Sequence, residues 1–180
     1  YIKAIGGSKK LKGLKAYQQN FTMSMQGMQL EGRAVVKTPN MLISEVKMGG
    51  NVVQKQVLNG DKGGVSTMQG SRAMTEDEVV SMQEEAYVIS ELEYTKDAYE
   101  IELKGVDTEA DQDVYVVVVT SPSGAKKTNY YAVESGLLVK SVSVTETPQG
   151  SISEETTYMD YKEVEGVKFP HTMKVATGPQ

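Results

Sequence analysis

The sequence has no cysteine, no tryptophan, two phenylalanines and a single histidine among its 180 residues. Without cysteine, neither disulfides nor thiolate metal sites can form. A zinc site needs several nitrogen, sulfur or oxygen ligands, and His171 offers only one imidazole. We therefore expect no metal site and no cofactor in this chain.

The familiar catalytic motifs are missing as well. Neither HExxH nor its inverted form HxxEH occurs, and there is no G-x-S-x-G elbow to supply a nucleophilic serine. His171 follows Pro170 in a strand-like segment, where a lone histidine is more often structural. The glycine-rich residues 60–64 lack the spacing of a phosphate-binding loop. We expect no catalytic residue, and a free-standing hydrolase is the last of the alternatives.

The acidic net charge and the lack of long apolar runs argue against a nucleic-acid-binding protein and a membrane-spanning protein. The net charge of −5 and the pI of about 5.0 argue against nucleic-acid binding. The longest apolar run, Val114 to Val119, is far too short to cross a bilayer, so we expect no transmembrane segment. The sequence opens at Tyr1 without methionine, so we expect a mature form or a domain excised from a longer chain.

Methionine and tyrosine are abundant, with ten residues of each. Methionine is flexible and polarizable, which suits an adaptable apolar surface, although ordinary core filling is the alternative.

The stretch 113–147 carries the strongest β pattern. Val114–Thr120 is an unbroken β-branched and aromatic run, typical of a strand buried on both faces. Strands over Tyr130–Val133 and Leu137–Thr145 follow after short turns. Together they predict a three-stranded antiparallel meander.

Alternation of apolar and polar residues predicts most of the other strands. Five strands at roughly ten-residue spacing are expected between Ala16 and Met68. The remaining expected segments are strands over Tyr99–Leu103, Ser151–Tyr161 and Val167–Val175, an acidic connector over 106–113 after Gly105, a turn at 148–150, and a loose tail over 177–180.

One helix interrupts the strands, and two short helices are expected before them. Residues 75–78 read Thr-Glu-Asp-Glu, a capping box with acids that suit the helix dipole. Val79, Met82, Ala86 and Ile89 then form one apolar stripe, which we expect to cover the concave face of the sheet. The N-terminal helix pair is expected at Tyr1–Ile5 and from Ser8 onward.

Three segments support a family resemblance: residues 1–7, Tyr-Ile-Lys-Ala-Ile-Gly-Gly, before a lysine and leucine helix; the hairpin 130–139; and the closing segment 158–170. The chain resembles the outer-membrane lipoprotein-sorting (LolA/LolB-like) proteins of bacteria. It looks most like the domain of this type at the C-terminus of pitrilysin/insulinase-type zinc peptidases of Bacteroidetes-like bacteria. The resemblance covers nearly the whole chain, but its motifs are turns and strand pairs, which mark a fold better than an activity.

The resemblance implies a half-open antiparallel barrel whose mouth is plugged by helices. The expected fold is therefore α+β, mainly β: a single domain over 1–180 with a curved half-barrel of about eleven strands. It also implies a periplasmic or outer-membrane-associated location. In the carriers of this family the cavity takes the acyl chains of lipoproteins, so the expected function is non-catalytic binding of a lipid chain or other lipophilic ligand. The alternative is a structural accessory domain that docks on an upstream zinc peptidase domain.

Nine residues are candidates for the ligand site. The expected cavity lining is Met23, Met25, Leu42, Val46, Val142 and Val144, and the expected lid is Val79, Met82 and Ala86. The alternative is that all nine are plain core, since a curved sheet with a helix across it can simply be filled.

Overall fold

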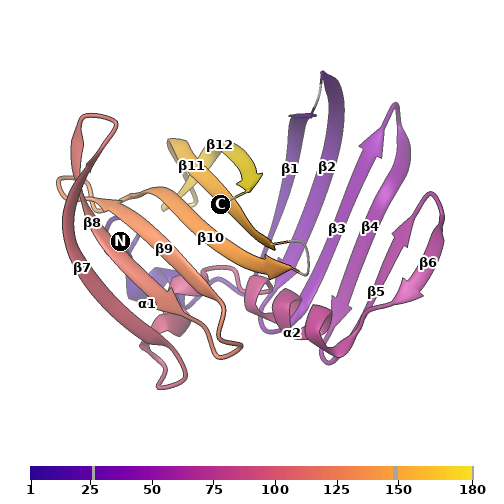
Figure 1. The fold of residues 1–180 in the computed structure, drawn as a ribbon, viewed down its shortest axis with the longest axis horizontal. Coiled ribbons are helices and arrows are strands. Elements are labelled where there is room, and N and C mark those ends of the chain that lie inside the picture. The colour runs from indigo at the N-terminus through magenta and orange to yellow at the C-terminus, as the bar shows by residue number, and fades with distance from the viewer. Residues whose placement is uncertain (26, 148–149, 180) are drawn as a thin grey trace. The chain divides into compact units, whose positions relative to one another are not determined.

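The computed structural model describes residues 1–25, 27–147 and 150–179. The chain forms two compact units. The N-sheet unit comprises Leu14–Ser90, and the C-sheet unit comprises Tyr1–Gly13 together with the chain from Glu91 onward. Each unit is built on its own antiparallel sheet of six strands (Figure 1).

The N-sheet unit is a six-stranded meander in which each strand pairs with the next. Its strands are β1 (Ala16–Met25), β2 (Met28–Lys37), β3 (Met41–Met48), β4 (Asn51–Asn59), β5 (Lys62–Thr67) and β6 (Gly70–Ala73). The five strands predicted between Ala16 and Met68 are confirmed. The short strand β6 was missed because its residues are all exposed and show no alternation.

One face of this sheet is apolar, and we call it the inner face. Across it Val36 lies opposite Leu42, and Leu42 lies opposite Leu58. All three side chains are buried. The residues in between, such as Glu45 and its partner Lys55, point to the other face and form an ion pair of 2.8 Å. The period-two pattern of the sequence therefore sets which face carries the core.

Gly32 allows an aromatic ring to lie on the strand β2. Phe21 is its partner on β1, and a Cβ atom at position 32 would lie 2.1 Å from the Phe21 ring. Only glycine leaves this space, so the ring takes the place of the missing side chain on the inner face.

The C-sheet unit contains two short helices and the remaining strands. They are α1 (Ser8–Leu11), η1 (Ser90–Thr95, which begins at the boundary of the units), β7 (Glu100–Glu109), β8 (Gln112–Thr120), β9 (Lys126–Ala132), β10 (Leu138–Thr147), β11 (Gly150–Val164) and β12 (Val167–Pro179). The sheet order runs from β12 to β7 in sequence (Figure 1). The meander predicted over 113–147 is confirmed as β8, β9 and β10.

The strand β8 is less buried than its sequence predicts. Val114 and Val119 are buried, but Tyr115 is 42% exposed and the valines between are half-buried. The prediction of burial on both faces was wrong because the neighbour β7 is an edge strand, and its exposed side chains cover little of β8.

Two boundary predictions were wrong for backbone reasons. Gly105 does not end its strand, because a bulge between Leu103 and Gly105 lets β7 continue to Glu109. The predicted connector 106–113 is therefore mostly strand. Its hairpin turn is Ala110-Asp111, both at positive φ.

The two chain ends also differ from expectation. Tyr1–Ile5 is a turn rather than a helix, and the helical segment after Gly7 is the single turn α1. Glycines 6 and 7, both at positive φ, end this turn after two backbone hydrogen bonds, from the Ile5 N–H to the Tyr1 carbonyl and from the Gly7 N–H to the Ile2 carbonyl. Residues 177–179, predicted as a loose tail, belong to β12 because the long strand β11 offers them a partner. The predicted turn at 148–150 lies mostly outside the described residues.

The mainly β fold class is confirmed, with twelve strands in the described part of the chain instead of about eleven. No helix among the described residues is long and apolar enough to cross a membrane.

Candidate functional site

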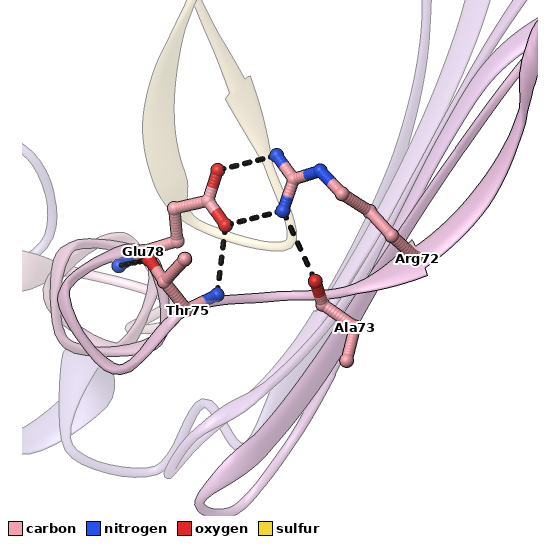
Figure 2. A network of polar contacts seen from close by, with 4 residues as sticks. All are labelled: Arg72, Ala73, Thr75 and Glu78. Atoms are coloured by element: carbon pink, nitrogen blue, oxygen red, sulfur yellow. Dashed lines mark hydrogen bonds and ion pairs between the residues drawn. The ribbon is translucent and has the colours of Figure 1, made fainter.

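The helix α2 (Glu76–Glu85) begins at the predicted capping box. Thr75 Oγ1 accepts from the Glu78 N–H at 3.3 Å, and the Glu78 carboxylate accepts from the Thr75 N–H at 2.9 Å (Figure 2). Two otherwise unpaired donors of the first turn are thus satisfied.

Arg72 on β6 fastens the start of this helix to the sheet edge. Its guanidinium donates to both oxygens of the Glu78 carboxylate, at 2.7 and 2.6 Å, and also to the Ala73 carbonyl at 3.0 Å (Figure 2). The Arg72 hydrogen bond, followed by that of the Thr75 backbone, lowers the pKa of Glu78 to about 2. We call this contact the Arg72–Glu78 clasp.

The rest of α2 crosses the sheet along one end of its strands. The Gln83 side chain donates to the Gly60 carbonyl at 2.8 Å, in the turn between β4 and β5. After the helix, the Val88 N–H donates to Thr38 Oγ1 at 3.1 Å, in the turn between β2 and β3. Burial, and secondarily the carboxylate of Glu85, raise the pKa of Tyr17 on β1. The helix and the residues after it therefore run from β6 past the β4–β5 turn to the β2–β3 turn.

The apolar stripe of α2 packs on the sheet. Val79 and Met82 are each 8% exposed, Ala86 at the end of the helix is fully buried, and the helix contacts β4. Burying a valine or methionine side chain contributes about 1.5–3 kcal/mol, so these contacts outweigh the exposed clasp as the main attachment of the helix. The predicted stripe is confirmed, although Ile89 lies beyond the helix end.

A pocket of about 410 Å³ opens between α2 and the sheet. Its lining is Gln56, Val65, Met74, Asp77, Glu78, Ser81, Met82 and Glu85. The apolar part is one valine and two methionines, and the acidic residues come from the helix. Pockets that hold small ligands have volumes of about 300–1,000 Å³, so this one is large enough.

Gly63 gives the pocket part of its shape. A Cβ atom at position 63 would lie 2.2 Å from the Met74 sulfur, so this methionine lies directly on the glycine backbone. The Met74 N–H donates to the Gly63 carbonyl at 2.9 Å, which holds the chain there as it enters the helix.

The nine predicted site residues fall into separate groups. Leu42 lies beside the turns that α2 crosses, so it shares one end of the sheet with the predicted lid residues Val79, Met82 and Ala86. Among the eight of these residues whose side chains are described, Met82 alone lines the pocket.

The other predicted lining residues lie elsewhere. Met23 and Val46 are half-buried and sit toward the opposite end of the inner face, opposite Leu30 and Gly32. Met25 pairs with Met28, but its side chain lies outside the described part. The last two, Val142 and Val144, are half-buried on β10 of the C-sheet unit. A ligand role for the nine residues stays a prediction.

Sequence reasoning missed Val65 and Met74 as pocket residues. A signal for Met74 was present: it precedes the N-cap Thr75, and Val79 is the fourth residue of the helix. These are the two positions of a hydrophobic staple. No sequence pattern indicated Val65, because it follows Gly63 and Gly64 and has no alternating apolar neighbours in its strand.

A second depression, of about 450 Å³, has a different character. It is lined by Asn20, Phe21, Thr22, Glu31, Gly32, Arg33, Glu45 and Lys47. Both signs of charge occur in it, and most of its side chains belong to the polar face of the sheet. Phe21 is the only large apolar side chain in this lining, and the charged residues distinguish it from the pocket under α2.

The C-sheet unit buries a cluster of phenols. The Tyr1 and Tyr131 rings lie 5.4 Å apart between centroids, and a hydrogen bond joins the hydroxyls of Tyr1 and Tyr161. Tyr161 in turn donates to the Leu138 carbonyl at 2.9 Å. Burial is the main cause that raises the pKa of all three phenols. Nearby Asn129 is 1% exposed, and its Oδ1 has no hydrogen-bond partner.

His171 takes no part in either region. It is exposed, and its Nδ1 lies 3.0 Å from the Phe169 carbonyl. Within the described residues, no group of three histidine or acidic side chains could hold a metal ion.

The fold is mainly β, with one helix lying across a sheet, and comparison with solved structures shows that it is LolA-like. Two of these structures illustrate the likeness. A DUF1329 family protein from Desulfovibrio piger ATCC 29098 has a TM-score of 0.61 at 10% identity, over 93% of this chain and 81% of that one. A LolA superfamily protein from Nitrosomonas europaea has a TM-score of 0.56 at 12% identity, over 89% and 75%. At such identities the likeness shows the fold alone. No protein-family model matches the sequence, and no curated protein matches it.

Proposed function

We propose that this chain is a non-catalytic, carrier-like domain that binds a lipid acyl chain or another lipophilic ligand under α2. The observation that supports it is the pocket of about 410 Å³ with Val65, Met74 and Met82 on its apolar side. The LolA-like fold agrees with this role, as does the periplasmic or outer-membrane-associated location that we propose with it.

The chemistry of the pocket favours a flexible apolar ligand. Each buried methylene of an acyl chain contributes about 0.8 kcal/mol, without any polar partner. The two methionines have several rotatable bonds and can repack around chains of different shape. The remaining inner face toward Met23 and Val46 would extend the site, because it is only half-buried.

Entry of a long chain requires α2 to shift on the sheet. The helix is attached by apolar contacts, which are non-directional, and by polar contacts at its two ends, the exposed clasp and the part-buried Gln83 bond to Gly60. A small displacement keeps the apolar contacts while the polar ones break and reform in water. In this proposal α2 acts as the lid.

The test is binding of a fluorescent fatty-acid probe to the purified chain, together with native mass spectrometry for lipids retained from expression. Met74→Glu places a carboxylate in the apolar side of the pocket, and we expect it to weaken probe binding by about tenfold or more. Val80→Glu is the matched control, since Val80 is 43% exposed and does not line the pocket.

Failure of the wild-type chain to bind the probe, with no lipophile in the mass spectra, would overturn the proposal. Equal losses in both variants would place the binding elsewhere. The accessory-domain alternative rests on the resemblance alone, and the gene sequence before Tyr1 tests it.

A further inference from the structure

The hairpin of β7 and β8 carries a strong negative charge over residues 100–113. Residues 100–113 contain six acids (Glu100, Glu102, Asp107, Glu109, Asp111 and Asp113) and one base (Lys104), a net charge of 1 − 6 = −5. Such a concentration creates a negative field at one place on the surface.

The strand β7 of this hairpin is one of the two edges of the C-sheet. The strand β7 pairs with β8 and ends the sheet order among the described strands. An edge strand presents a row of unpaired backbone N–H and C=O groups, which can pair with another extended chain.

The same edge carries an exposed apolar row. Ile101, Leu103 and Val106 are 52%, 62% and 61% exposed. Their partners on β8 are Val119, Val117 and Tyr115, which share one face of the sheet, so the bulge at Gly105 keeps the apolar row on a single side.

Most of the acids lack a basic partner. Glu102 pairs with Lys104 at 2.7 Å, and Glu109 pairs with Lys140. Within the described chain no basic side chain pairs with the other four acids of the hairpin. Their charge is therefore available to a partner.

We propose that the outer edge of β7 is a docking surface for a basic, extended segment of another protein, which adds a strand to the sheet. Apolar residues of the segment would lie on Ile101, Leu103 and Val106, and its lysines or arginines would lie against the acids. A second copy of this chain is the wrong occupant, because two acidic edges would repel each other. This inference is independent of ligand binding under α2.

The experiment uses the full chain and three fluorescent peptides as long as β7. They alternate lysine with valine, glutamate with valine, and lysine with serine. We expect the lysine–valine peptide to bind best, the lysine–serine peptide more weakly, and the glutamate–valine peptide not at all. Because exposed charges are screened by salt, affinity should fall between about 0.05 M and about 0.5 M salt. Backbone amide exchange should slow in β7 and not in β12, the other edge of the sheet.

Charge reversal sharpens the test. We expect the double substitution Glu100→Lys with Glu102→Lys to weaken lysine–valine binding by about tenfold, since exposed charge pairs are modest individually. Glu31→Lys with Glu154→Lys is the control, because it makes the same change of net charge at exposed positions on strands inside the sheets.

No binding of the lysine–valine peptide, equal binding of the glutamate–valine peptide, or an equal loss in the control would each overturn the proposal. In those cases the acids only protect an exposed edge from aggregation.

Discussion

The two sheet units have the same strand count and pairing, but they bury different chemistry. The inner face of the N-sheet unit buries aliphatic side chains such as Leu42 and Leu58 beneath a helix. The C-sheet unit also buries aliphatic side chains, among them Ile5, Leu11 and Val114, but it adds the polar side chains of Asn129 and Ser141 beside hydrogen-bonded phenols. Equal topology therefore does not imply an equal core.

The two cores differ in how freely their side chains can rearrange. Aliphatic and methionine contacts are non-directional and tolerate small shifts of one element over another. A chain of hydrogen bonds such as Tyr1 to Tyr161 to the Leu138 carbonyl fixes distances and angles, and a broken member leaves a buried polar group unpaired. We therefore expect the N-sheet unit to yield to a ligand and the C-sheet unit to stay rigid.

The largest expected effect is the loss of a buried leucine under α2. Leu58→Ala should lower the free energy of unfolding by about 2–5 kcal/mol, because Leu58 is 2% exposed and its removal leaves a cavity. Urea denaturation measures the loss, and amide exchange shows where it acts. Exchange should quicken first in β3, β4 and α2.

Ile43→Ala provides the control for this prediction. Ile43 neighbours Leu42 on β3 but points to the other face, where it is 43% exposed. Its truncation should cost much less. If both variants lose the same stability, or if exchange quickens first in the phenol cluster, the proposed contrast between the two units is wrong.

The sequence predicted the N-sheet unit better than the C-sheet unit for this same reason. The periodic spacing of apolar residues indicates which face of a strand or helix packs on an apolar surface, and it identified Leu42 and the α2 stripe. The phenol cluster follows no period, since Tyr1 meets Tyr131 and Tyr161 only through tertiary contact. Local patterns carry no information on such contacts.

Two details of the backbone were also not predicted from the sequence. A bulge at Gly105 and a two-residue turn at Ala110-Asp111 turned a predicted connector into half of a hairpin. In the site, the helix and its cap were predictable because the capping box is local in sequence. The pocket was not predictable, because it depends on Met74 lying over Gly63.

A smaller loss of stability is expected when a hydrogen bond in the phenol cluster of the C-sheet unit is removed. Tyr161→Phe removes the donor to the Leu138 carbonyl and the partner of Tyr1, and it should cost about 1 kcal/mol. Urea denaturation measures this, with exchange quickening around β10 and β11 and no change in α2. Tyr115→Phe, at a phenol that is 42% exposed, is the control.

Alkaline titration probes the same cluster. Burial raises the pKa of Tyr1, Tyr131 and Tyr161 in the folded state above the ordinary value of about 10. The stabilisation from their protonated forms is therefore fully present below about pH 10 and is lost as the pH rises further. Tyrosinate absorbance should show these phenols ionising together with unfolding. Their ionisation in the folded protein near pH 10 would contradict a rigid, buried cluster.

The smallest expected effect concerns the Arg72–Glu78 clasp. The clasp lowers the pKa of Glu78 from its ordinary value of 4.5 to about 2, so its contribution is present above about pH 4.5 and is lost as the pH falls toward 2. Because both side chains are exposed, the loss of the clasp in acid should loosen only the first turn of α2, with little change in global stability.

The substitution Glu78→Gln should loosen the same turn at neutral pH, measured as faster amide exchange at the start of the helix. Glu76→Gln, in the same turn but outside the clasp, separates this effect from that of the helix dipole. If acid instead quickens exchange throughout both units, the clasp is part of the global fold and α2 is no separately movable lid.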